Sequence, residues 1–157
     1  MNSTPTDNSK SDGPQLRIIT QYSKSIHFEN LAAQNKLQLS GNPDVSVNVN
    51  VSLQPLSDIA TEVTLKVEAV AVLKEDKIFS VSCEYAAIAE VSNFTDENKE
   101  IALSSEIPRF IFPFLRNIIS TAVLEANYPP LLLAPIDFFQ LYKKQAASQK
   151  EAVPTTH

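Results

Sequence analysis

A chain of 157 residues, 43% of them hydrophobic, is long enough for one domain with its own core, so a disordered polypeptide is excluded. The net charge is −5 and basic residues never gather beyond Lys143 and Lys144, which argues against nucleic-acid binding because phosphates require concentrated cations. Glycine occurs only at Gly13 and Gly41, too few for the glycine-rich loops that hold phosphates in nucleotide-binding proteins.

The N-terminal third predicts a flexible arm, one strand and a long connection. Residues 1–14 are polar and lack the apolar segment of a secretory signal. Alternating side chains then predict a strand over residues 16–29, with Ile19 and Lys24 as exceptions to the alternation. Its apolar face comprises Leu16, Ile18, Tyr22, Ile26 and Phe28. Residues 30–43 break the pattern and predict a connection.

Three further segments alternate in the same way. They predict strands over residues 45–53, 62–71 and 79–85, with the last fading through residues 86–91. Residues 55–58 have the composition of a turn, and residues 74–77 form a charged hairpin loop. These short connections predict that the last three strands form an antiparallel meander.

The spacing of apolar residues changes in the C-terminal third. Residues 93–100 predict a polar loop, after which a spacing of three and four predicts a helix from Pro108 to Glu125. Pro113 is expected to bend or break its first turn. Residues 127–135 predict an apolar loop, Asp137 is expected to cap a last helix, and residues 145–157 are expected to form a flexible tail.

Four strands followed by two helices predict an α+β fold, in which a four-stranded antiparallel sheet has both helices packed on one face. The first helix also has apolar residues outside its main face, namely Phe110, Phe112 and Ile119, which predicts self-association through this helix. The apolar run over residues 107–123 contains Arg109 and Arg116 and falls short of a membrane span, so no membrane insertion is expected.

Residues suited to catalysis or metal binding are scarce. His27 falls among polar strand residues, and Cys83 falls on an apolar strand face where a thiol is a poor nucleophile. The acidic residues near Asp96 lack the spacing and the turn glycine of a calcium loop. We therefore expect no catalytic residue, metal or cofactor. The single cysteine excludes an intrachain disulfide and favours a reducing, cytoplasmic location.

Apolar residues in the predicted connections are the most informative feature. They are Leu31, Leu37 and Leu39 in the first connection, and Leu131, Leu132, Leu133 and Ile136 in the last. Such residues either cap the core or line a groove for apolar segments of another chain, and the pattern leaves both alternatives open. Each leucine-sized side chain that is fully buried contributes roughly 1.5–3 kcal/mol.

Three motifs resemble those of SecB, the bacterial export-chaperone family, and occur in the same order. Residues 22–30, YSKSIHFEN, resemble its first-strand motif, and residues 110–119, FIFPFLRNII, resemble its first-helix signature. Residues 128–138, YPPLLLAPIDF, are similar to its helix-connecting loop and the start of its second helix. The resemblance covers residues 15–144, which we expect to be the chaperone domain.

The resemblance implies a homotetramer, a dimer of dimers, that holds precursor proteins unfolded without ATP and passes them to the SecA motor ATPase. It implies that the seven apolar residues of the two connections form the client-binding groove. The implied SecA-docking positions are Ser25, Glu29 and Ser82, of which only Glu29 keeps a carboxylate, so weaker docking is expected. The implied tetramer contacts are Val81, Cys83, Tyr85, Ile111, Leu115 and Ile118.

Two alternatives remain. The altered acidic face favours a SecB-like chaperone for another client, such as a labile antitoxin. A small-molecule enzyme on the same scaffold would need polar groups that converge in a closed pocket, and the sequence indicates no such set.

Overall fold

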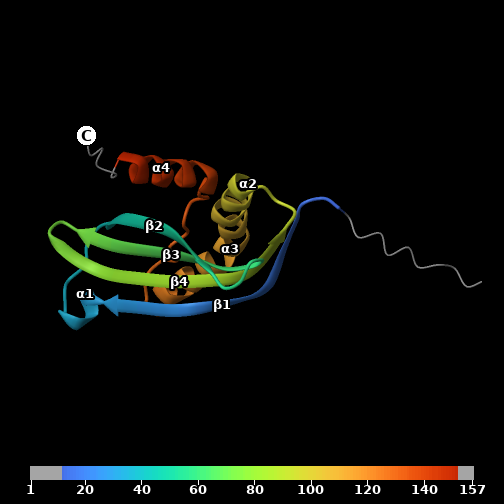
Figure 1. The fold of residues 1–157 in the computed structure, drawn as a ribbon. Helices are drawn as coiled ribbons and strands as arrows, with labels where there is room; N and C mark the ends of the chain where they lie inside the picture. Colours follow the sequence, from blue (N-terminus) through green and yellow to red (C-terminus); the bar gives the residue numbers. More distant parts are fainter. Residues whose placement is uncertain (1–11, 152–157) are drawn as a thin grey trace, which may run out of the picture.

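The computed structural model describes residues 12–151 as a sheet with helices on one face (Figure 1). The strands are β1 (Gln15–Asn30), β2 (Asp44–Pro55), β3 (Ala60–Leu73) and β4 (Asp76–Ser92), antiparallel in the order β1-β4-β3-β2. The helices are α1 (Leu31–Gln34), α2 (Asp96–Ile101), the π-helix η1 (Ala102–Glu106), α3 (Ile107–Glu125) and α4 (Phe138–Glu151). The predicted α+β fold is therefore confirmed.

The core lies between the sheet and α3. Every second residue of β3 and β4 points to α3, and residues such as Val63, Leu65 and Cys83 are completely buried there. Helix α3 meets the sheet with one residue per turn, each at most 1% exposed: Ile107, Ile111, Leu115, Ile119 and Val123. This stripe follows from the helical period of the sequence, and it fixes α3 across the strands. Ile119 belongs to the stripe and Phe112 is also buried, so their predicted placement outside the main face of the helix is wrong, and of the three residues only Phe110 is exposed.

Strand β1 contains two extra residues that change which face its side chains occupy. The register with β4 shifts between Ile18 and Thr20 and between Ser23 and Ser25, so Ile19 and Lys24 are the unpaired extra residues. They are the same two residues that break the alternation in the sequence. Between these bulges the faces are exchanged, and Tyr22 pairs with Ala86 on the face away from the helices. The predicted placement of Tyr22 on the apolar face is therefore wrong.

Helical structure begins earlier than predicted. Residues 96–101, expected in a polar loop, form α2, because the Thr95 hydroxyl accepts a hydrogen bond from the Asn98 backbone at 3.3 Å and caps the helix. Asp96 and Glu97 then lie in the first turn, where negative charge stabilises a helix. Helix α3 continues through Pro113, so the expected break does not occur.

The continuous helical run Asp96–Glu125 is long and apolar enough to count as a candidate membrane span by length and composition. A core helix of a globular protein meets the same criterion. Here Leu115 and Ile119 are fully buried against the sheet, so we assign α3 to the core.

Helix α4 starts at the predicted cap but ends later than predicted. The Asp137 carboxylate accepts a hydrogen bond from the Gln140 backbone at 3.1 Å, as predicted for an N-cap. The helix then extends to Glu151, so residues 145–151 are helical and their assignment to a flexible tail is wrong. Ala146 and Ala147 are strong helix formers, which a composition argument based on small residues overlooks. Residues 1–11 of the predicted arm and residues 152–157 of the predicted tail lie outside the described residues.

An apolar groove as the candidate functional site

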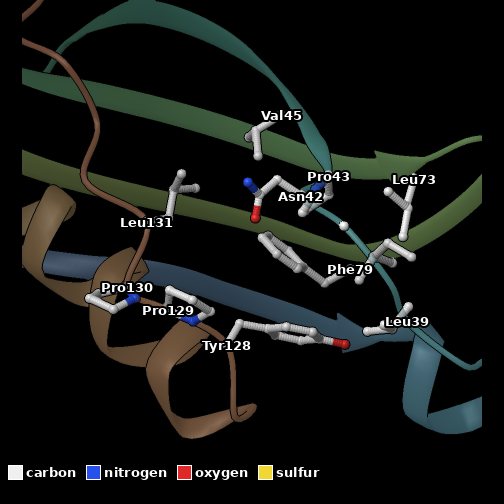
Figure 2. A pocket seen from close by; sticks show the side chains of 12 residues that line it. Leu39, Asn42, Pro43, Val45, Leu73, Phe79, Tyr128, Pro129, Pro130 and Leu131 are labelled. Carbon is white, nitrogen blue, oxygen red and sulfur yellow. The ribbon is translucent and has the colours of Figure 1, made fainter.

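An apolar groove of about 340 Å³ opens where the connection after α1 and the loop after α3 pass over one end of the sheet (Figure 2). We call this site the apolar groove. Three segments line it: the connection into β2 (Leu39, Gly41, Asn42, Pro43, Val45), the sheet (Leu73, Ile78, Phe79), and the loop after α3 (Tyr128, Pro129, Pro130, Leu131).

Two aromatic rings lie at the centre of the groove lining. The Phe79 and Tyr128 ring centroids are 5.2 Å apart, and Phe28 also stacks on Phe79 with ring centroids 5.7 Å apart. The Tyr128 hydroxyl donates a 2.6 Å hydrogen bond to Asn30 Oδ1. Burial raises the pKa of Tyr128, so its hydroxyl stays protonated and remains a donor at neutral pH.

The local sequence explains why the last loop presents Tyr128. Asn127 ends α3 with φ = 68°, a left-handed conformation that asparagine tolerates better than most residues. The Tyr128 backbone then donates to the Val123 carbonyl at 3.3 Å, which turns the chain back over the sheet. Pro129 and Pro130 follow, and because they have no N–H they leave few polar groups to satisfy in an apolar loop.

Only part of the predicted groove set lines this groove. Leu39 and Leu131 do so from opposite segments. Leu37 lines two hollows next to it, of about 500 and about 230 Å³, and Leu39 is shared with both. The structure thus brings Leu37, Leu39 and Leu131 into one neighbourhood.

The other predicted residues lie elsewhere. Leu132 is 76% exposed and Leu133 is buried in the core, although they are neighbours in the chain. Ile136 lines a separate hollow at the start of α4, together with Phe138. Leu31 is half-buried in the first turn of α1, outside the groove lining. Within the leucine-rich loop, Leu133 therefore caps the core and Leu131 lines the groove.

The strand residues of the groove lack any sequence signal. Phe79 belongs to an alternating segment and Leu73 follows one, and their place in a groove depends on which end of the sheet the last loop reaches. Tyr128 could have been found, because an aromatic residue directly before two prolines in an apolar loop is unusual.

The predicted docking positions share the face of the sheet that faces away from the helices. Register with β4 places Ser25 opposite Glu84, and Glu29 and Ser82 on the same face. The Ser25 hydroxyl donates a 3.0 Å hydrogen bond to the Glu84 carboxylate. A carboxylate is therefore present next to the position where serine replaces the acidic residue expected for the family.

A hydrogen-bonded charged cluster on this open face is built around Glu62. Lys24 Nζ lies 2.8 Å from Glu62 Oε1, and the Tyr22 hydroxyl donates to the other carboxylate oxygen. The hydrogen bonds from Lys24 and Tyr22 lower the pKa of Glu62. The hydrogen bond between Tyr22 and Glu62 also raises the pKa of Tyr22. The second bulge of β1 places Lys24 in this position.

The predicted tetramer contacts are mostly inside the protomer. The buried members are Val81, Cys83, Tyr85, Ile111 and Leu115, whereas Ile118 is half-buried. These side chains belong to the core between the sheet and α3, so we expect the buried ones to influence association mainly by supporting α3. Burial also raises the pKa of the Cys83 thiol to about 11.

The exposed apolar surface of α3 lies on its other face. Phe110, Phe114 and Leu124 are all exposed, and Phe114 stacks on Tyr85 with ring centroids 6.0 Å apart. Neighbouring β1 adds exposed Leu16 and Ile26. These residues extend the apolar surface that the sequence indicated at Phe110.

The groove offers little polar chemistry. Within residues 12–151, no group of three or more His, Cys, Asp or Glu residues is arranged to hold a metal ion. In the same part of the chain, every buried side-chain nitrogen or oxygen has a hydrogen-bond partner. Most of the residues that line the groove are apolar, and Asn42 adds a polar side chain.

Comparison with known proteins agrees with the family resemblance of the three sequence motifs. The family model described as preprotein translocase subunit SecB matches residues 9–149. The protein-export protein SecB of Bradyrhizobium diazoefficiens is 38% identical over 152 residues, 96% of this chain and 93% of that protein. The SecB of Maricaulis maris is 36% identical, over 96% of this chain and 88% of that protein.

A solved structure is similar in fold. It is a Mycobacterium tuberculosis SecB-like chaperone in complex with a peptide from the HigA1 antitoxin, with a TM-score of 0.58 and 15% identity over 77% of this chain and 90% of that chain. The resemblance in the three sequence motifs is thus confirmed, and the chain belongs to the SecB family of preprotein translocase subunits.

Proposed function

We propose that this chain is an ATP-independent export chaperone of the cytoplasm, which holds precursor proteins unfolded and delivers them to the SecA motor for transport across the inner membrane. The observation that supports this most directly is the apolar groove, open to solvent and lined by Leu39, Phe79, Tyr128 and Leu131. The curated relatives named protein-export protein SecB support the same assignment.

The groove suits unfolded chains for a physical reason. A folded protein keeps its apolar side chains in its own core, whereas an unfolded precursor presents them in extended segments that fit a groove. Each fully buried side chain of leucine size contributes roughly 1.5–3 kcal/mol, so a few contacts reach affinities on the order of micromolar after the cost of association. No nucleotide is required for such binding.

Two neighbouring leucines provide the test. Leu131 lines the groove, whereas Leu132 is largely exposed and lines none of the described hollows. Leu131→Ser is expected to weaken binding of a denatured precursor about 10-fold or more, because one apolar contact is lost, and Leu132→Ser is expected to change it less than about 2-fold. The assay is titration of a fluorescently labelled unfolded precursor, with suppression of aggregation measured without nucleotide. Equal effects of the two changes would contradict groove binding.

The homotetramer, as a dimer of dimers, is part of the proposal. Exposed Phe110, Phe114 and Leu124 on α3 support it, because a monomer gains nothing from apolar side chains left in water. Light scattering is expected to give four times the 17.3 kDa mass of one chain. A mass of one chain at micromolar concentration would refute the assembly.

Docking to SecA is proposed on the open face of the sheet. Glu29 and Glu84 lie on that face, and Glu84 places a carboxylate beside Ser25. Glu29→Gln and Glu84→Gln are each expected to weaken SecA binding, with a smaller effect at high salt because exposed charges are screened. Calorimetric titration with SecA at two salt concentrations measures this, and unchanged affinity in the double variant would place docking elsewhere. The antitoxin alternative rests on likeness in fold alone.

A further inference from the structure

Tyr128 separates two hollows of different character. On one side is the apolar groove of about 340 Å³. On the other is a hollow of about 500 Å³, which we call the polar hollow because Asn30, Lys36, Gln38 and Asn127 line it. Tyr128 and Leu39 line both. Figure 2 shows the Tyr128 ring with its hydroxyl end toward Leu39, so these two side chains form the wall between the hollows.

The position of the Tyr128 ring depends on a small number of contacts. Its ring packs on Phe79 at a tilt of 39°, and its hydroxyl donates to Asn30 Oδ1 at 2.6 Å. The contact with Phe79 alone leaves the ring free to slide, because aromatic pairs tolerate many offsets. The hydrogen bond fixes the one end of the ring that faces the polar hollow.

Asn30 is itself held from three directions. Its Oδ1 accepts a second hydrogen bond from the Ala33 backbone at 3.1 Å, which caps α1. Its Nδ2 donates to the Ala126 carbonyl at 3.2 Å, at the end of α3. One side chain therefore joins the end of β1, the start of α1 and the end of α3, and it leaves Oδ1 in a fixed position for the tyrosine.

We propose that Asn30 is a positioning residue that holds the Tyr128 ring as a fixed wall and thereby sets the boundary and the selectivity of the apolar groove. This inference rests on the proposed binding of unfolded chains in that groove. With the wall in place, the groove presents a preformed aromatic surface of defined size. Without the hydrogen bond the ring turns, and the two hollows join into a longer and more polar channel.

Peptide selectivity tests the consequence for binding. The probes are two labelled, unstructured peptides that differ only in a central phenylalanine or leucine. A fixed ring favours the phenylalanine peptide through ring packing, so Tyr128→Phe is expected to lower the ratio of the two affinities about 3- to 10-fold, the range of one hydrogen bond. Asn30→Ala should lower it equally, and the double variant should be no worse than either single variant because the two residues act as a unit.

The matched control is Tyr142→Phe, which removes a hydroxyl from α4 outside both hollows. It should leave the ratio unchanged. Thermal unfolding of each variant separates a loss of stability from a change in selectivity, since a purely structural role would lower the melting temperature without changing the ratio. An unchanged ratio in Tyr128→Phe, or additive losses in the double variant, would overturn the inference.

A measurement without any peptide separates this inference from the proposed function. In protein with isotope-labelled tyrosine, slow ring flipping gives Tyr128 separate NMR signals for its two ring edges. Asn30→Ala is expected to speed flipping about 3- to 10-fold, as the loss of one hydrogen bond implies. Equal flip rates in both proteins would refute the positioning role even if peptides bind. Failure of the unaltered protein to bind either peptide would instead refute the proposed function, and the flip rates would still decide the role of Asn30.

Discussion

Leu115 and Leu124 lie on opposite faces of α3 and allow the core role of this helix to be tested against its proposed role in assembly. Leu115 is 0% exposed beneath the sheet, whereas Leu124 is 56% exposed on the far face. The same change, leucine to alanine, can therefore be made on one helix in two environments. Helix propensity is nearly equal in both cases and cancels in the comparison.

The expected costs differ because only one site leaves a cavity. Leu115→Ala removes three buried carbon atoms under close packing, which typically costs about 3–5 kcal/mol in the free energy of unfolding. Leu124→Ala exposes no new cavity in the protomer and is expected to cost less than about 0.5 kcal/mol there. For a chain of this size, about 1 kcal/mol corresponds to roughly 2–4 °C, so Leu115→Ala should lower the melting temperature by roughly 6–20 °C.

Urea unfolding followed by circular dichroism measures both values. Because association of subunits stabilises the folded state by mass action, all variants must be compared at one protomer concentration. Light scattering on the same samples should show that Leu124→Ala weakens the assembly while Leu115→Ala leaves the native fraction assembled. Equal unfolding costs for the two changes, or a cost below about 1 kcal/mol for Leu115→Ala, would refute the assignment of α3 as the core helix.

Three further outcomes test separate features. The pKa of Glu62 lies below its ordinary value of 4.5, so its stabilising contribution is present above that pH and is lost as the pH falls below it. Glu62→Gln should therefore reduce the loss of the free energy of unfolding at acid pH. Glu68→Gln, at an exposed side chain, is the control. Asn127→Ala should cost about 1–2 kcal/mol in thermal unfolding because alanine resists the left-handed conformation, whereas Asn127→Gly should cost nothing. Since burial raises the pKa of Cys83 to about 11, a thiol reagent at pH 8 should modify it only after urea is added, and rapid native modification would contradict its burial.

Much of the fold was predictable because it depends on local periodicity. The alternation of apolar and polar residues over residues 45–53 predicts a strand with one covered face. The spacing of apolar residues from Ile107 to Val123 predicts a helix with one buried stripe. The start of α2 was missed because one capping threonine outweighs a polar composition. The end of α4 was missed because alanine was counted as small rather than as a helix former.

The sequence by itself determined the four strands and the two long helices, their order, the family and the presence of excess apolar residues in two connections. Only the tertiary structure decided which of those residues line a groove. Leu131, Leu132 and Leu133 are chemically identical, and they differ only in the direction that the loop gives each side chain. Likewise, Asn30 and Tyr128 are 98 residues apart and meet only because β1 and the end of α3 reach the same corner of the sheet. Periodicity reports that a side chain is covered or exposed, but a partner across the chain is selected by packing, which no local pattern encodes.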